Sequence, residues 1–561
     1  MGQSVAPVRS VWIILPLLLL TVFVATFDPN VNRWPVNFTW LAALLVWTFG
    51  VGWADRPGRN RGRDRKYAWP FVLFVPVFAA LWLPFYDNWR WVQAGDSFPY
   101  FWLPAAAAKN GLAKSILSMR GVDDHFPYTS VIVDNVLMFI FGPTLFWHRA
   151  SKFVISLLAL LSIYTFFSLI LEFPWALAVV IVTAATFHWQ NFSHISFTHI
   201  DSFIIAYLAL VALTLILREP QRRRWWLALG IVGGLSLFFT QTAWAEVAAS
   251  ALVLVGWAAY RRHLTALAIC GLSFLIAATP AGLQLPDVLR ATTVQTRVVW
   301  DWVYLSGIFR TILWLPCGKT WTAVEWNGYF AGWPCGYFYV TGLVLAALTV
   351  VPAIRRRLQL PPAVVGLLLL FLAETVVMTL TNNANSNPSA KRTYHLIPLQ
   401  AFFALLPLYT AALAVRGSAL AYRAVTGAGF LAVAAYALAS ASLFVYPERF
   451  GFGGNLFDGI VQMRQRFPDR KVLIFAPQKN IKDEVDDPRT MLNESYHVAE
   501  TVSVTRTIDA ATVDAACAAH AILCDHTLPQ NREDLARAAA GHQLRQVDVF
   551  AVSDLQCFEC K

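Results

Sequence analysis

Long apolar runs alternate with short polar segments over the first 445 residues of the chain. A helix needs roughly 20 residues to cross the hydrocarbon core of a bilayer, and most of the runs approach that length. Because no water is present there to satisfy backbone N–H and C=O groups, each run is expected to be a helix. The pattern predicts an all-α polytopic membrane protein with about thirteen transmembrane helices, at Val11–Phe27, Phe38–Trp53, Ala68–Phe85, Ala150–Leu171, Trp175–Trp189, Asp201–Leu217, Trp225–Thr242, Trp244–Tyr260, Leu264–Leu283, Gly336–Val351, Pro361–Leu380, Leu396–Val415 and Val425–Tyr446.

The composition agrees with this interpretation. Hydrophobic residues make up 57% of the 561 positions and charged residues only 14%, whereas soluble domains carry about 25% charged residues. The 23 tryptophans suit a chain with many membrane–water boundaries, where amphipathic rings settle. We therefore expect a multi-pass integral membrane protein of a plasma or inner membrane.

Positive charges orient the predicted helices. The net charge is +11, and many of the basic residues fall in short segments between apolar runs: Arg56, Arg59, Arg61, Arg63, Arg65 and Lys66; Arg218 and Arg222–Arg224; Arg261 and Arg262; Arg355–Arg357. Such clusters are typical of cytoplasmic loops and argue against nucleic-acid binding. With an odd number of spans, the N-terminus is predicted to be cytoplasmic and the C-terminal segment extracytoplasmic.

Four outer loops follow from this orientation: 86–149, 190–200, 286–335 and 381–395. The first contains an apolar segment, Val131–Phe146, which is short and interrupted by Asp134. Counting that segment as a span would place the later arginine clusters outside. It is therefore predicted to be a helix lying in the interface.

After Tyr446 the apolar runs end, and strand-like and helix-like stretches alternate. The strand-like run at Lys471–Ala476 is followed by the helical stretch Ala510–Ala521, a pattern that predicts a small α/β domain. The expected organisation is residues 1–67 with two additional helices and a basic loop, a membrane core over 68–446, and an extracytoplasmic α/β domain over 447–561.

Six of the seven cysteines lie on the predicted outer side, and only Cys270 lies inside an apolar run. An even set on that side fits disulfides in an oxidising compartment. The C-terminal pair Cys557 and Cys560 could instead be a redox or metal pair.

Asp96 is the leading candidate for a catalytic role. It lies just outside a predicted span, in the aromatic segment FYDNWRWVQAGDSFPY at Phe85–Tyr100. A carboxylate in such a position can take a proton from an attacking hydroxyl, and partial desolvation would raise its basicity. The alternative is a carboxylate that only caps a helix.

A second outer loop supplies further candidates. Asp201 opens a span directly after His199, and ionisable groups at a membrane boundary are candidate functional residues. Caps or solvated side chains are the alternative. Asp96 and Asp201 together could hold a divalent cation. Glu246, near the outer end of an apolar run, could line the same pocket.

Cations in the last outer loop point to a phosphate ligand. The segment KRTYHLIPL carries Lys391 and Arg392 beside Tyr394, against the inside-positive pattern. Arginine binds phosphate bidentately and lysine binds it as a point charge; the alternative is a solvated pair. Arg297 is a secondary candidate of the same kind. Because no cytoplasmic segment is long enough for a nucleotide-binding domain, an activated membrane lipid is the donor that fits.

These segments resemble the GT-C superfamily of polyprenyl-phosphate-sugar-dependent glycosyltransferases, which includes protein O-mannosyltransferases and lipid A aminoarabinose transferases. The resemblance covers roughly Ala68 to Val415. It rests on the order and spacing of GDSFPY with Asp96, PYTSVIVDNVLMFIFG followed by HRASKF, Asp201, and KRTYHLIPL. The chain departs from many relatives in having Ser97 after the first acid, Gln241-Thr242 where a lysine is common, and two spans before Ala68.

The resemblance implies transfer of a sugar from a polyprenyl-phosphate carrier to an acceptor hydroxyl on a protein, lipid or glycan. The reaction would invert the anomeric centre, with Asp96 as base. Two other classes stay open: a transporter or flippase of a lipid-linked or anionic solute, and a membrane scaffold whose C-terminal domain binds a partner.

Overall fold

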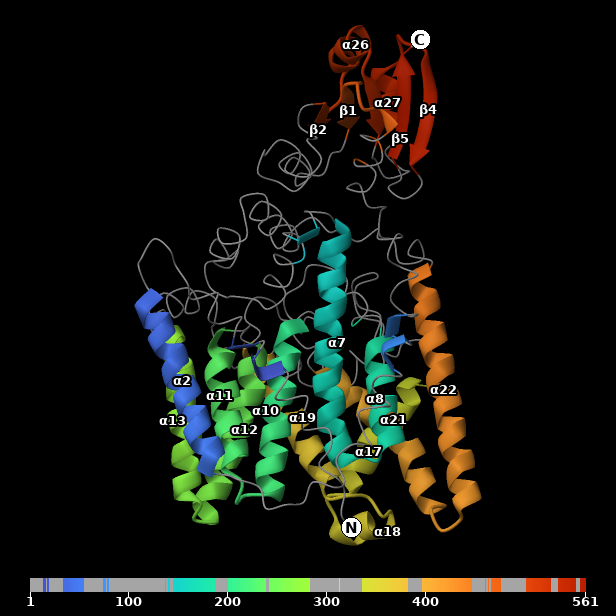
Figure 1. Ribbon diagram of the computed structural model, residues 1–561. Coiled ribbons are helices and arrows are strands. Elements are labelled where there is room, and N and C mark those ends of the chain that lie inside the picture. The colour runs from blue at the N-terminus through green and yellow to red at the C-terminus, as the bar shows by residue number, and fades with distance from the viewer. Residues whose placement is uncertain are drawn as a thin grey trace.

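The computed structural model consists of a bundle of apolar helices and a small α/β domain beyond one end of the bundle (Figure 1). The structure describes residues 34–54, 145–186, 200–238, 242–282, 335–381, 396–445, 466–475, 501–525, 533–550 and 555–560, together with the shorter pieces 14–16, 18–19, 74–76, 78–79, 137, 140–141, 189, 312, 460 and 463.

Most of the predicted spans correspond to described helices. The helices are α2 (Trp34–Ala54), α7 (Leu145–Ile170), α8 (Phe173–Ala185), α10 (Ile200–Arg218), α11 (Arg223–Leu235), α12 (Thr242–Tyr260), α13 (Leu264–Gly282), α17 (Cys335–Leu348), the short α18 (Pro352–Arg357), α19 (Ala363–Thr381), α21 (Ile397–Ala414) and α22 (Ala419–Val445), with a 3₁₀ turn η4 (Ser236–Phe238) after α11. The predicted spans Val11–Phe27 and Ala68–Phe85 lie mostly outside the described residues, and the total of about thirteen stays a prediction.

Length and composition identify the chain as an integral membrane protein. Among the described residues, three helical segments are long and apolar enough to cross a membrane: Ala150–Ile170, Ile397–Ala414 and Ala419–Leu438. Shorter apolar helical segments accompany them in α2, α8, α10, α12, α13, α17 and α19.

The basic turns of the bundle meet at one end. The Arg218 guanidinium at the end of α10 donates to the carbonyl oxygen of Leu169 at the end of α7. Arg416, after α21, pairs with Glu172, between α7 and α8, at 2.7 Å. The α/β domain lies beyond the opposite end of the bundle (Figure 1). We refer below to the end with the basic turns as the basic end and to the other as the domain end.

Close packing inside the bundle depends on small residues. The helices α11 and α13 approach so closely that a methyl group added at Gly234 would lie 2.6 Å from the Cβ of Ala277. In α17, a methyl group at Gly342 would overlap the carbonyl oxygen of Phe403 in α21. Small residues are what allow membrane helices to approach in this way.

The helix α2 packs on the rim of the bundle against α13. The indole of Trp40 donates to the carbonyl oxygen of Ile276 at 2.7 Å, and that of Trp47 donates to the hydroxyl of Ser273 at 2.8 Å. Its other face exposes large apolar side chains such as Phe49, as expected for a helix in contact with lipid.

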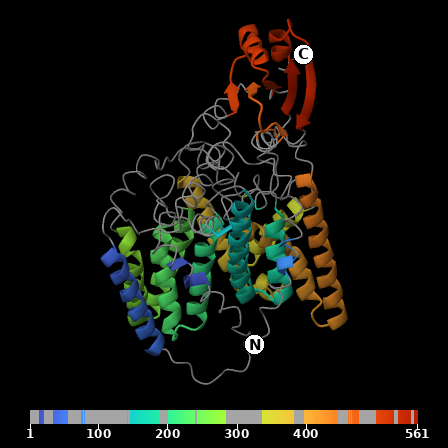
Figure 2. The ribbon, with the colours of Figure 1, turned by 45° about the horizontal axis from the view of Figure 1, so that its top comes forward.

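The α/β domain is a five-stranded sheet with the order β2-β1-β3-β5-β4. The strands β2 (Val502–Thr505), β1 (Val472–Phe475) and β3 (Ile522–Asp525) are parallel, whereas β5 (Leu555–Cys560) runs antiparallel to β3 and to β4 (Leu544–Phe550). Two helices, α26 (Ala510–Ala518) and α27 (Glu533–Ala538), complete the described part of the domain (Figure 2).

The helix α26 begins at a side-chain cap. Asp509 Oδ1 accepts hydrogen bonds from the hydroxyl and the backbone N–H of Thr512, at 2.6 and 2.8 Å. These bonds favour the ionised carboxyl and lower the pKa of Asp509 below its ordinary value.

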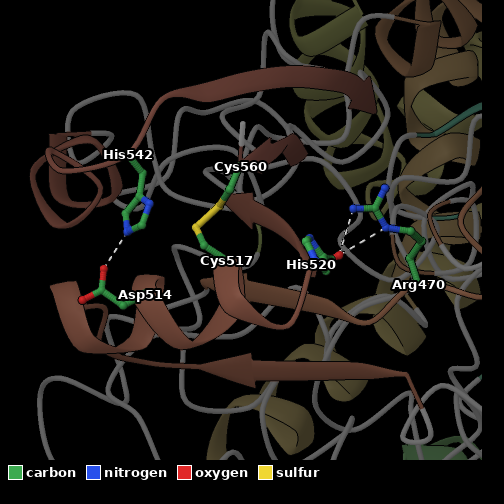
Figure 3. Close-up of a disulfide and its surroundings, with 6 residues drawn as sticks. All are labelled: Arg470, Asp514, Cys517, His520, His542 and Cys560. Atoms are coloured by element: carbon green, nitrogen blue, oxygen red, sulfur yellow. Dashed lines mark hydrogen bonds and ion pairs between the residues drawn. A yellow bond between two sulfur atoms is a disulfide. The ribbon is translucent and has the colours of Figure 1, made fainter.

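Two disulfides attach the C-terminal strand to the rest of the domain. Cys524 of β3 bonds to Cys557, and Cys517 of α26 bonds to Cys560 (Figure 3). Near the second bridge, His542 and Asp514 pair at 2.6 Å, and Arg470 donates to the carbonyl oxygen of His520 at 2.8 Å. The C-terminal pair is therefore divided between two disulfides, which agrees with the first of the two sequence interpretations and not with a metal or redox pair.

The Gly342 contact can be tested with the substitution Gly342→Ala. The new methyl group must displace the backbone of α21, and overpacking of this kind costs about 1–3 kcal/mol. We expect a clearly lower melting temperature in detergent, measured by intrinsic tryptophan fluorescence.

The control is Gly366→Ala in α19, where a methyl group would meet nothing within 4 Å. Alanine is the better helix former by about 1 kcal/mol, so this variant should be as stable as the unmodified protein or more so. Equal melting temperatures for the two variants would contradict the packing.

Candidate functional site

The described residues bear on the predicted site only in part. Asp201 is the second residue of α10 and Glu246 lies in the first turns of α12, with only the backbone described for each. The remaining predicted site residues lie outside the described residues: Asp96, His199, Arg297, Lys391, Arg392 and Tyr394. The structure describes the helices on both sides of the predicted loops 190–200, 286–335 and 381–395, and α7 after loop 86–149.

An aromatic cluster on α7 joins α10 and α21. The ring of Phe167 lies 6.4 Å from that of Tyr207 in α10 and 5.9 Å from that of Phe402 in α21. Phe166 also contacts Tyr207, edge to face at 5.7 Å. Because one side chain of α7 touches both neighbours, α10 and α21 flank α7 at the same depth.

This contact fixes the depth in the bundle at which α10 and α21 begin. Asp201 lies six residues before Tyr207, and Ile397 lies five residues before Phe402. At 1.5 Å per residue, both positions lie about 8–9 Å beyond Phe167 toward the domain end. Helix axes in contact are about 8–10 Å apart, so the two helix starts lie within roughly 20 Å of each other. The structure therefore brings the start of the helix that carries Asp201 close to the start of the helix that follows Lys391 and Arg392.

Glu246 occupies the same half of the bundle. Trp257, further along α12, stacks on His263 at the basic end, with ring centroids 5.3 Å apart. Glu246 lies eleven residues before Trp257, which is about 16 Å along the helix toward the domain end.

Two buried polar side chains lie below these helix starts. Phe371 of α19 contacts Phe403 of α21, edge to face at 5.3 Å. One turn closer to the domain end on each helix are Glu374, 2% exposed, and Gln400, 0% exposed. A carboxylate and an amide at equal depth in an apolar bundle are costly and mark a candidate functional position.

Neither Glu374 nor Gln400 is among the site residues predicted above. Lys152, also buried at 3% exposure, was missed too. It lies fifteen residues before Phe167, about 22 Å along α7 toward the domain end. A polar residue interrupting an apolar run was the signal for Gln400. Lys152 stands at the edge of its run, where a solvated lysine would be ordinary.

A different set of contacts joins the helix turns at the basic end. Glu172 accepts a hydrogen bond from the hydroxyl of Tyr422 and pairs with Arg416, and Trp175 packs on Tyr409 with ring centroids 5.5 Å apart. We refer to these five residues as the basic-end clasp. The clasp links the α7–α8 turn to the α21–α22 turn, which gives Glu172 a structural role.

No cluster of three or more histidine, cysteine or acidic residues that could hold a metal ion occurs among the described residues. A divalent cation at Asp96 and Asp201 stays a prediction, because the side chains of both fall outside the described set.

Comparison with known proteins found similarity among solved structures. No protein-family model matches the chain, and no curated protein sequence matches it. Among solved structures, the chain is similar to the crystal structure of ArnT from Cupriavidus metallidurans in the apo state, with a TM-score of 0.45 and 13% sequence identity. The match covers 87% of this chain and 97% of that chain. A likeness at this score and identity carries no argument about activity.

The role of Phe167 can be tested by truncation. Phe167→Ala removes the ring that joins α7, α10 and α21, and a buried phenylalanine replaced by alanine costs about 3–5 kcal/mol. We expect a large fall in the melting temperature of the purified protein. Phe49→Ala, at a position 75% exposed on α2, serves as the matched control and should change stability by less than about 0.5 kcal/mol. A similar fall in melting temperature in both variants would show that Phe167 contributes no more to packing than an exposed side chain.

Proposed function

We propose that the protein is a membrane glycosyltransferase that moves a sugar from a polyprenyl-phosphate carrier to an acceptor hydroxyl on the extracytoplasmic side. The observation that carries the proposal is the shared depth of the starts of α10 and α21 around Phe167. This arrangement supports the proposal, because the helices next to the predicted acidic and cationic segments begin within roughly 20 Å of each other.

The proposed orientation has two supports. The arginine-rich turns gather at the basic end, as cytoplasmic turns do. The α/β domain beyond the other end contains two disulfides, which persist in oxidising compartments. In this proposal the domain end faces outward, and a lipid-borne donor reaches the site from the outer leaflet.

The proposed chemistry is a single displacement. Asp96 takes the proton from the acceptor hydroxyl while the hydroxyl oxygen bonds to the anomeric carbon of the donor sugar. The bond from that carbon to the phosphate oxygen breaks at the same time. The electron pair leaves with the polyprenyl phosphate. Lys391 and Arg392 stabilise its charge, with Tyr394 and Arg297 as further donors. His199, Asp201 and Glu246 would line the sugar pocket.

Asp96→Asn tests the base. The amide keeps the shape of the carboxyl group but cannot accept the proton, and losing a general base typically costs about 10²–10⁴-fold in rate. We expect membrane insertion and melting temperature to be unchanged and transfer of radiolabelled sugar from membrane lipid to be lost. Transfer near the unmodified rate would remove Asp96 from the mechanism.

Two buried or half-buried glutamates at opposite ends of the bundle give a second test. Glu374→Gln replaces the buried carboxyl group next to the proposed pocket with an amide of the same shape and should reduce transfer at least tenfold with little change in melting temperature. Glu172→Gln weakens the half-exposed basic-end clasp, a pair worth about 1 kcal/mol or less. It should lower the melting temperature slightly and leave transfer unchanged. Loss of transfer in Glu172→Gln together with unchanged transfer in Glu374→Gln would contradict the proposal, because the functional site would then lie at the basic end.

A further inference from the structure

Two turns at the basic end lie side by side and carry exposed arginines. The ring of His263, in the α12–α13 turn, lies 6.3 Å from that of Trp226 in α11. The Trp226 indole donates to the carbonyl oxygen of Pro220, in the α10–α11 turn, at 3.0 Å. Through these contacts the start of α11, with Arg223, adjoins the α12–α13 turn, with Arg261 and Arg262. We refer to these three exposed arginines as the arginine patch.

Arg262 has a backbone conformation that usually requires glycine. Its φ is 58°, in the left-handed region. The N–H of His263 donates to the carbonyl oxygen of Ala258 at 2.9 Å, and that of Arg262 donates to the carbonyl oxygen of Ala259 at 3.2 Å. This pair of bonds is a Schellman motif, whose left-handed position strongly favours glycine. A strained arginine where glycine is preferred suggests that the side chain is needed.

The same motif recurs at Gln359, after α18. Gln359 has a φ of 55°, and the N–H of Leu360 donates to the carbonyl oxygen of Arg355 at 3.2 Å. The backbone problem is identical, but the side chain is uncharged. Gln359 therefore separates the effect of backbone strain from that of charge.

The arginine patch has no acidic partner among the described residues, since the ion pair at these turns joins Arg222 to Glu219, at 2.7 Å. The Arg261 guanidinium lies 5.5 Å from the ring centre of Tyr260, which is 81% exposed. Apolar side chains continue from the patch along the lipid-facing surface of the two helices, including Leu264 and Val253. Positive charge at the membrane boundary with an apolar track beside it matches the form of a phospholipid.

We propose that the arginine patch binds the head group of an anionic phospholipid in the leaflet at the basic end. The guanidinium groups donate to the phosphodiester oxygens, and the acyl chains lie along the exposed face of α12 and α13. Basic sites between membrane helices bind the head groups of anionic lipids. The free energy of that binding offsets the backbone strain held at Arg262.

The experiment compares full-length unmodified protein with Arg262→Gly and Gln359→Gly in nanodiscs of phosphatidylcholine alone or with added phosphatidylglycerol. In phosphatidylcholine, both glycine variants should melt about 1–2 °C higher than the unmodified protein, because the strain is released. On adding phosphatidylglycerol, the unmodified protein and Gln359→Gly should gain equally, whereas Arg262→Gly should gain less than half as much. Native mass spectrometry should detect correspondingly fewer bound phosphatidylglycerol molecules on Arg262→Gly.

Three results would overturn the proposal. An equal gain in all three proteins would remove Arg262 from lipid binding. Failure of Arg262→Gly to gain stability in phosphatidylcholine would mean that the side chain serves the fold itself. The same gain produced by inorganic phosphate in phosphatidylcholine nanodiscs would show that a free anion, not a lipid, is the ligand.

Discussion

The absence of water from the hydrocarbon core is the constraint on which this structure depends. Every backbone N–H and C=O group there needs a partner within its own segment, so the apolar runs are helices. Serine and threonine side chains follow the same rule: Thr165 and Thr375 donate to the carbonyl oxygens of Leu161 and Phe371, four residues earlier. Most of the remaining polar chemistry is displaced to the ends of the bundle.

The two ends have different physical characters. At the basic end, short turns carry arginines: Arg416 pairs with Glu172 and Arg222 with Glu219, whereas the arginine patch has no acidic partner among the described residues. At the domain end, longer connections leave the helices, and Glu374 and Gln400 lie buried one turn beyond the ring contact of α19 and α21. Asymmetry of this kind allows one face of a membrane protein to anchor the bundle while the other face holds the chemistry.

Phe167 shows how a single packing contact relates distant parts of the chain. Asp201 and Ile397 are almost two hundred residues apart in sequence, yet one ring sets the depth of both helices. The proposed function draws on this arrangement, because the helices next to the acidic and cationic segments begin at the same level. The basic-end clasp holds the opposite ends of α7 and α21 in register.

The sequence by itself determined the helices, the basic turns and the presence of strands after Tyr446, because apolar periodicity and charge clustering are local properties. It also indicated Asp96, Asp201, Lys391 and Arg392 as candidates, although their side chains lie outside the described residues and their roles stay predictions. Only the tertiary structure decided that α10 and α21 flank α7 at one depth, that Gln400 is buried level with Glu374, and that Cys524 bonds to Cys557 and Cys517 to Cys560. These relations depend on which helix faces and strand edges meet, and the free energy of such contacts comes from residues far apart in the chain, which no local pattern records.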